Sequence, residues 1–262
     1  MHYKIPRALL CATMLSATAG AHAGIESISS QVEHADYDSG RGDRDVFGIN
    51  VTGRAGDTRW QAGAAHGQRD FGETAFSGTR VGASLHHDWS SRLSTRTSAA
   101  FSDDNPVFAN QEFTQDVKLK LVRNTVFNLG GRYAEYYGGT YVTGWSAGAE
   151  YYLPRLTASY RHSRHRLSTG GSGYGNTLSL RLKDAQGRGH TQLWLGNGTS
   201  AYAPDMDPLL LRDSRSSSVF LRRSQPLGEH LMLNLGIGKT WHETRHDRFQ
   251  SISSQLGLGY HW

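Results

Sequence analysis

The chain has 262 residues, and its 28 Lys and Arg against 23 Asp and Glu give a formal charge of +5. This mild, dispersed charge argues against a nucleic-acid-binding protein, which would need a concentrated basic patch. The mean hydropathy is −0.54, and no window of about 18 apolar residues follows Gly24, which excludes membrane-spanning helices. A transmembrane β-barrel is not excluded, because only half of its strand side chains face lipid.

The amino terminus has the three parts of a secretory signal peptide. Lys4 and Arg7 form a basic start, Ala8 to Ala19 is a short apolar stretch, and Ala21-His22-Ala23 is an A-x-A-like cleavage site. We therefore predict that residues 1–23 are removed and that residues 24–262 form one exported domain.

Removal of residues 1–23 takes away two bases and no acid, which lowers the formal charge from +5 to +3. It also removes Cys11, the only cysteine of the chain. A disulfide framework and a thiolate metal site are therefore excluded from the exported domain.

Apolar and small or polar residues then alternate along most of the chain, which is the pattern of β-strands. The alternating segments start near Phe47, Val81, Leu93, Phe113, Tyr141, Leu178 and Leu231. The pattern is less distinct near Thr191 and Val219. No comparable helical stripe occurs.

The last eleven residues alternate without interruption. Ile252, Leu256, Leu258, Tyr260 and Trp262 would share one face, with small and polar residues on the other. A transmembrane barrel strand has this form, because one face meets lipid, the other faces a wet lumen, and aromatic residues lie at the membrane interface. We expect Leu256, Leu258 and Tyr260 to face lipid.

Along the chain, short connections between the alternating segments alternate with long ones. Outer-membrane barrels have this pattern, because their periplasmic turns are short and their outer loops are longer. The exception is Gly138-Gly139, which is tight where a long loop is due. The segments predict an all-β, antiparallel, up-and-down barrel of about 14 strands, with 12 as the alternative, and both termini in the periplasm. The long connections centre on residues 37–44, 69–76, 103–110, 168–173, 199–211 and 242–249.

Several blocks resemble the YaiO family of outer-membrane β-barrel proteins. They are Phe101 to Ala109 with Phe113 to Asp116, Arg132 to Tyr137, Ser159 to His162, and Gly189 to Leu195. The resemblance extends over nearly all of the chain after residue 23, and departs from the family where Trp262 replaces the usual terminal phenylalanine. It implies an outer-membrane barrel inserted by the barrel assembly machinery, and it implies no established substrate, cofactor or catalytic residue.

Three motifs that could carry chemistry are better explained as barrel features. Gly144 to Gly148 matches G-x-S-x-G, but Ser146 lies within a predicted strand and no helix follows, as a nucleophile elbow requires. His162 and His165 are three residues apart, so on one strand they point to opposite faces and cannot share a metal ion. His242 and His246 lie near two acids in a predicted outer loop, where zinc capture is an alternative to a solvated loop. We predict no catalytic residue, metal or cofactor.

The alternation also predicts a lumen with more bases than acids. The inward acids would be Asp88, Glu112, Asp116 and Glu150. The inward bases would be Arg80, Arg96, Lys118, Lys120, Arg132, Arg155, Arg161, Arg181 and Lys183, together with Arg54, Arg59 and Arg222. Lumen charges often pair with one another, but a basic surplus in a pore favours anions.

Three functions are compatible with this barrel. The first is a passive conduit or accessory pore for an anionic or sugar-rich solute, including surface polysaccharide export. The second is an outer-membrane enzyme that acts on lipid, and the third is a structural barrel that does not conduct. A continuous inner stripe of aromatic pairs would favour sugar transport, and a Ser–His pair at the lipid boundary would favour the enzyme. The sequence does not fix the oligomeric state.

Overall fold

The computed structural model describes residues 24–262 except 73, 201–213 and 245–246. The predicted signal peptide and its cleavage site lie outside the described residues. The described chain forms a closed antiparallel barrel of fourteen strands in sequential order, which confirms the predicted fold class and strand number. Within these ranges no helix has the length and apolar character needed to cross a membrane.

The strands are 10 to 14 residues long, enough to span a bilayer at the usual tilt of barrel strands. Their bounds are β1 Gly24–Tyr37, β2 Asp43–Ala55, β3 Thr58–Asp70, β4 Ala75–Asp88, β5 Leu93–Ser102, β6 Gln111–Val122, β7 Thr125–Glu135, β8 Tyr141–Tyr152, β9 Leu156–Leu167, β10 Ser172–Lys183, β11 His190–Ser200, β12 Ser214–Pro226, β13 Leu231–Glu243 and β14 Arg248–His261.

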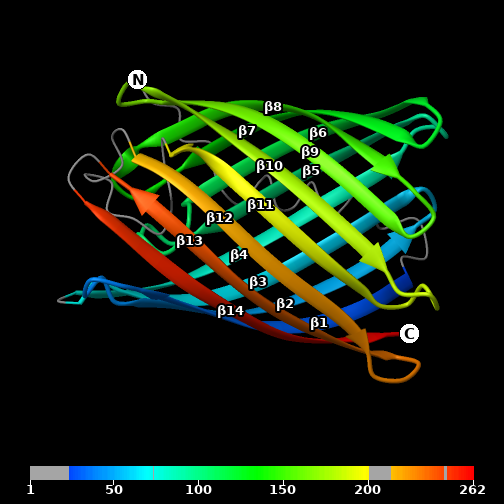
Figure 1. Cartoon of the computed structure of the whole chain (residues 1–262), viewed down its shortest axis with the longest axis horizontal. Helices are drawn as coiled ribbons and strands as arrows, with labels where there is room; N and C mark the ends of the chain where they lie inside the picture. The colour runs from blue at the N-terminus through cyan, green and yellow to red at the C-terminus, as the bar shows by residue number, and fades with distance from the viewer. Residues whose placement is uncertain (1–23, 73, 201–213, 245–246) are drawn as a thin grey trace.

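The barrel closes where β1 pairs with β14, in a register that runs from Ser27 opposite His261 to Tyr37 opposite Ser251. This closure leaves no strand edge unpaired, as a bilayer demands. Figure 1 shows the tilted strands and the carboxyl terminus at the end of the barrel where β1 begins. We call this the turn end, and the opposite end, where β1 finishes, the loop end.

The predicted alternation sets the two faces of the wall. On β14, Leu256 is 55% exposed and faces outward, whereas Gln255 points into the barrel and donates hydrogen bonds to Gln31 and Glu33 of β1. Glu33 therefore also faces the lumen, and it is an inward acid that we did not predict. The segments near Thr191 and Val219 are strands β11 and β12.

Several strands extend further at the loop end than predicted, so four of the connections there are shorter than predicted. The first covers residues 38–42 rather than 37–44, and the second covers 71–74 rather than 69–76. At these strand ends the outward side chains become polar. The difference in polarity between the two faces is therefore lost, although the backbone hydrogen bonds between the strands continue. His34 of β1 and Asp45 of β2, for example, are hydrogen-bonded at 2.8 Å across the outer face. The tight Gly138-Gly139 connection is confirmed as a single 3-10 turn, η1, at Tyr137–Gly139.

The register of β14 gives a paired stability test. Leu256→Arg places a charge on the lipid face and should lower the free energy of unfolding by about 2–4 kcal/mol if the residue lies near the bilayer midplane. Gln255→Arg should cost much less, because that side chain faces the wet lumen beside Glu33. Denaturant titration of both variants in lipid vesicles measures the difference, and equal losses would show that the faces are assigned wrongly.

Candidate functional site

Two cavities inside the barrel share one stretch of wall. The first, of about 400 Å³, lies against the inner face of β1 to β6. The second, of about 390 Å³, lies against β5 to β9. Arg96, Ser98 and Thr114 line both cavities. The lumen along β1 to β9 therefore offers a connected polar surface with Arg96 at its centre.

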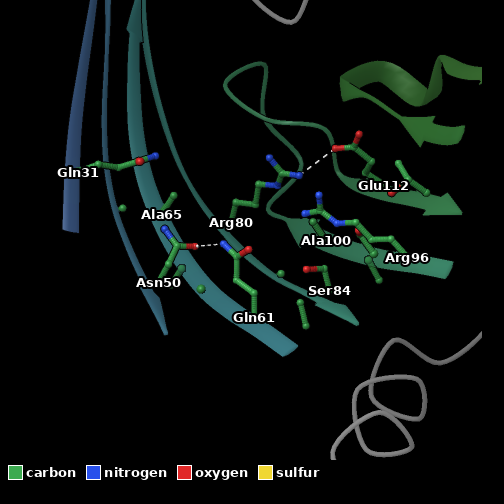
Figure 2. A pocket seen from close by; sticks show the side chains of 17 residues that line it. Gln31, Asn50, Gln61, Ala65, Arg80, Ser84, Arg96, Ala100 and Glu112 are labelled. Carbon is green, nitrogen blue, oxygen red and sulfur yellow. Dashed lines mark hydrogen bonds and ion pairs between the residues drawn. The ribbon is translucent and has the colours of Figure 1, made fainter. Parts of the chain in front are cut away.

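The first cavity exists because the inner wall is built from small residues. Gly48, Gly63, Ala65, Gly82 and Ala100 line it between a few polar side chains. Figure 2 shows the longer ones, including Gln61, which donates a hydrogen bond to Asn50 at 3.1 Å. Arg80 and Arg96 extend into the same space from neighbouring strands. Small residues leave room for a solute, and the arginines give that room a positive character.

An ion-pair network crosses the wall from β4 to β9. Glu112 accepts from Arg80 Nη2 at 2.9 Å and from Arg132 Nε at 2.8 Å. Nearer the turn end, Asp116 accepts from Arg161 at 2.8 Å, and Glu150 accepts from Lys118 at 2.8 Å. The carboxylates thus neutralise part of the predicted basic surplus.

The network is held close to the wall by a glycine. A Cβ at Gly130 would lie 2.4 Å from Asp116 Oδ1 and 2.8 Å from Ser146 Oγ. Any larger residue at position 130 would push the Asp116 carboxylate away from β7 and disturb its pairing with Arg161. Ser146 therefore lies on the lumen wall within β8, with no helix after it.

Arg96 differs from the other basic residues of this wall. It is exposed to the lumen, and it forms no ion pair or hydrogen bond through its side chain with any described residue. With Arg80, Lys118, Arg132 and Arg161 it gives five cations against the three carboxylates of the network. These eight described groups leave a surplus of two positive charges, one of them carried by the unpaired guanidinium of Arg96.

The remaining predicted bases lie elsewhere. Arg155 lies in the turn before β9 and donates to the Lys183 carbonyl at 3.2 Å, and Lys183 ends β10. Lys120 is exposed near the turn end of β6. Arg181 projects from β10 and donates to Gln192 at 3.0 Å. Arg54 and Arg59, near the turn end, pair with Glu26 at 3.3 Å and Asp88 at 3.9 Å.

An aromatic pair lies on the inner face of β11 and β12. The rings of Trp194 and Phe220 are 5.6 Å apart, and the Arg222 guanidinium carbon lies 5.6 Å from the Trp194 ring centroid. A Cβ on Gly236 or Gly238 of β13 would lie 2.7 or 2.5 Å from a ring carbon of Phe220, so these glycines leave room for the ring. Aromatic faces beside a guanidinium form a surface suited to a sugar ring that carries a negative charge.

The connection between β5 and β6 folds into the barrel, where we predicted an outer loop. Val107 is 1% exposed and Phe108 is 6% exposed, and both pack with Val46 of β2 against Ala65 and Phe76. Ala109 packs against the wall formed by β7 to β9, where it contacts Ala134, Tyr136, Val142 and Leu167. We call residues 103–110 the inner loop. It narrows the lumen at the loop end.

The inner loop rests on two glycines and is closed by its own hydrogen bonds. Gly67 of β3 and Gly78 of β4 face each other in register. A Cβ on Gly67 would come within 2.8 Å of Val107 and Phe108, and one on Gly78 within 2.2 Å of Asn105. Asn105 Oδ1 accepts from the Val107 amide at 2.9 Å, and Ser102 donates to the Ala109 carbonyl at 2.8 Å. The loop is therefore a fixed part of the wall.

The structure separates the residues that resembled chemical motifs. His162 lies outward and hydrogen bonds with Asn176 at 2.8 Å, whereas His165 lines the second cavity. His242 is buried within β13, and His246 lies outside the described residues. In the described ranges no group of three His, Cys, Asp or Glu side chains could hold a metal ion. The absence of activity and of cofactors stays a prediction.

Solved channel structures share this fold at low sequence identity. CymD, a monoaromatic hydrocarbon channel, superposes with a TM-score of 0.65 at 7% identity, over 99% of this chain and 94% of the channel. A bacterial polysaccharide outer-membrane secretin gives 0.57 at 8% identity over 90% and 98% of the two chains. The anion-selective porin from Comamonas acidovorans gives 0.51 at 10% identity over 92% and 100%. These likenesses establish the porin-like barrel fold.

The family follows from the sequence itself. The model of the YaiO membrane β-barrel domain matches residues 25–204, which cover β1 to β11 and the whole of the ion-pair network. The match contains every block in which we noted the resemblance. Together with the closed barrel, it shows that this chain belongs to the YaiO membrane β-barrel family.

Proposed function

We propose that this protein is a passive outer-membrane conduit that favours anionic, sugar-rich solutes, with both termini in the periplasm. The observation that carries the proposal is Arg96, an unpaired guanidinium on the wall that the two lumen cavities share. A fixed positive charge at that position attracts anions and repels cations without any conformational step. The porin-like fold is compatible with this role and does not identify the solute.

Two further features favour acidic sugars among anions. Trp194 and Phe220 provide flat apolar surface beside Arg222, and binding sites commonly combine aromatic walls with a few placed polar groups. Glu112, Asp116 and Glu150 are each held by a base, so they repel an anion less than free carboxylates would. Surface polysaccharide export is the use of such a conduit that we consider first.

Uptake into vesicles tests the solute class. Liposomes that contain the purified protein should admit a small uronic-acid oligosaccharide faster than a neutral oligosaccharide of the same length, because only the former is attracted by the basic lumen. The preference should fade toward 1 M salt, where screening acts within about 3 Å. Faster entry of the neutral sugar at low salt would contradict the proposal. The location is tested separately by membrane fractionation, which should place the protein with the outer membrane.

A further inference from the structure

Two arginines project from the outer surface of β9 near the loop end. Arg164 and Arg166 are exposed and alternate along β9 with Ser163 and His165, which share the inward face with Arg161, the partner of Asp116. Two residues along a strand separate side chains by about 6.5–7 Å. Arg164 is in register with Trp145 of β8 and with Tyr174 of β10. The outer wall therefore carries a row in which a cation lies between two aromatic residues.

The aromatic residues mark a membrane interface at this height. Trp145 is 55% exposed, and its ring lies 6.0 Å from that of His162, which stacks on Tyr174 at 6.5 Å. Barrels carry such girdles where the hydrocarbon layer meets the head groups. Toward the turn end, the outward residues of β9 that follow His162 are Tyr160, Ala158 and Leu156. Arg164 lies at the girdle, and Arg166 lies beyond it on the head-group side.

Neither arginine pairs with an anion in the part of the chain that the structure describes. Both side chains lack an ion pair or hydrogen bond with any described residue, and the outward residues opposite Arg166 are Thr143 and Ser172. Glu135 of β7, an outward acid two strands away from β9, already accepts hydrogen bonds from Gln111 and Tyr133. Guanidinium groups bind phosphate strongly and in a bidentate manner.

We propose that Arg164 and Arg166 bind the phosphate groups of a phosphorylated glycolipid in the outer leaflet of the outer membrane. This inference rests on one part of the proposed function, the orientation that turns the loop end outward, and not on conduction. Trp145 and Tyr174 would contact the sugar and the upper acyl region of the same lipid. The site would fix the rotation and height of the barrel in its asymmetric membrane.

Native mass spectrometry of the detergent-solubilised protein tests the site with defined probes. The probes are lipid A with two phosphates, the same lipid after dephosphorylation, and inorganic phosphate alone. The wild type should retain the bisphosphorylated lipid about tenfold more strongly than the dephosphorylated form, as expected for one or two charge-assisted hydrogen bonds. Inorganic phosphate should not compete at equal concentration, because it lacks the contacts with the rings.

The double variant R164Q/R166Q should lose this preference, and R164K/R166K should keep most of it. The matched control is R215Q, because Arg215 is an outward, exposed arginine near the loop end of β12 without an aromatic row. Equal retention of both lipids by the wild type would overturn the proposal. So would an unchanged preference in R164Q/R166Q, or competition by inorganic phosphate, which would indicate a simple anion site. Bilayer conductance of the same preparations reports on the conduit separately.

Discussion

Replacing Arg96 with glutamate is expected to reduce the anion preference of the conduit about thirtyfold at low salt. Two unit charges about 8 Å apart interact by about 0.5 kcal/mol in water, so a change of two charges makes anion entry about 1 kcal/mol less favourable and cation entry about 1 kcal/mol more favourable. The change also removes the surplus of two positive charges on the wall. The measurement is the reversal potential of single channels in a salt gradient.

The R96E experiment has controls within the same chain. R123E makes the same charge change in the turn between β6 and β7, outside the lumen cavities, and should leave selectivity almost unchanged. R96Q should give about half of the effect without placing a second carboxylate near Asp116. In contrast, R132Q should act mainly on structure, because it frees Glu112 and Tyr136 from their shared partner. An unaltered reversal potential in folded R96E and R96Q would remove Arg96 from the selectivity mechanism.

Replacing Gly67, which contacts the inner loop, with a larger residue should widen the pore. In Gly67→Val the side chain would overlap Val107 and Phe108, whose atoms lie within 2.8 Å of the Cβ position. Valine suits a β-strand, so the barrel should persist while the loop is displaced, at a cost of about 1–3 kcal/mol for the lost packing. Single-channel conductance should rise, because residues 103–110 would no longer narrow the loop end.

The matched control for this change is Gly131→Val, since the Cβ position at Gly131 of β7 has no atom within 4 Å. Deletion of residues 104–109 is a second way to widen the pore, because it removes the inner loop and leaves Gly67 and Gly78 unchanged. Both G67V and the deletion should conduct better than the wild type, and G131V should not. Unchanged conductance in both would mean that the inner loop does not limit the pore.

The barrel could be predicted because its signal is repeated in every strand. Alternation in β14, with Leu256 outward and Gln255 inward, is fixed by the pleat and needs no knowledge of distant residues. The tight turns add an independent signal. The strand ends were harder to place, because residues such as His34 and Asp45 are polar on the outward face and resemble loop residues.

The inner loop could not be predicted from local patterning. Residues 103–110 are rich in turn formers, and turn formers favour a connection without indicating whether it folds outward or inward. Its burial depends on Gly67 and Gly78, which are 27 to 41 residues away in sequence from the loop residues they contact and meet them only after the barrel closes. The apolar Val107-Phe108 pair was the available signal, because such a pair is unusual at the tip of a solvated loop.

The lumen charges were predictable as a list but not as a network. Alternation indicates that Arg80, Arg132 and Glu112 point inward, yet the shared carboxylate between β4, β6 and β7 depends on strand stagger. For the same reason the sequence could not distinguish Arg96, which remains unpaired, from Arg161, which binds Asp116. The sequence therefore predicts the sign of the lumen charge, and the fold shows which cation is available to a solute.

The proposed conduit function requires that the wild-type barrel conducts ions and that it prefers anions. Purified protein in a planar bilayer, under a tenfold potassium chloride gradient at low total salt, should open stable channels whose reversal potential shows anion preference. That preference should weaken as both chambers approach 1 M salt, where the lumen charges are screened. A silent bilayer with correctly folded protein, or a cation-preferring reversal potential, would contradict the conduit and favour a structural or enzymatic barrel.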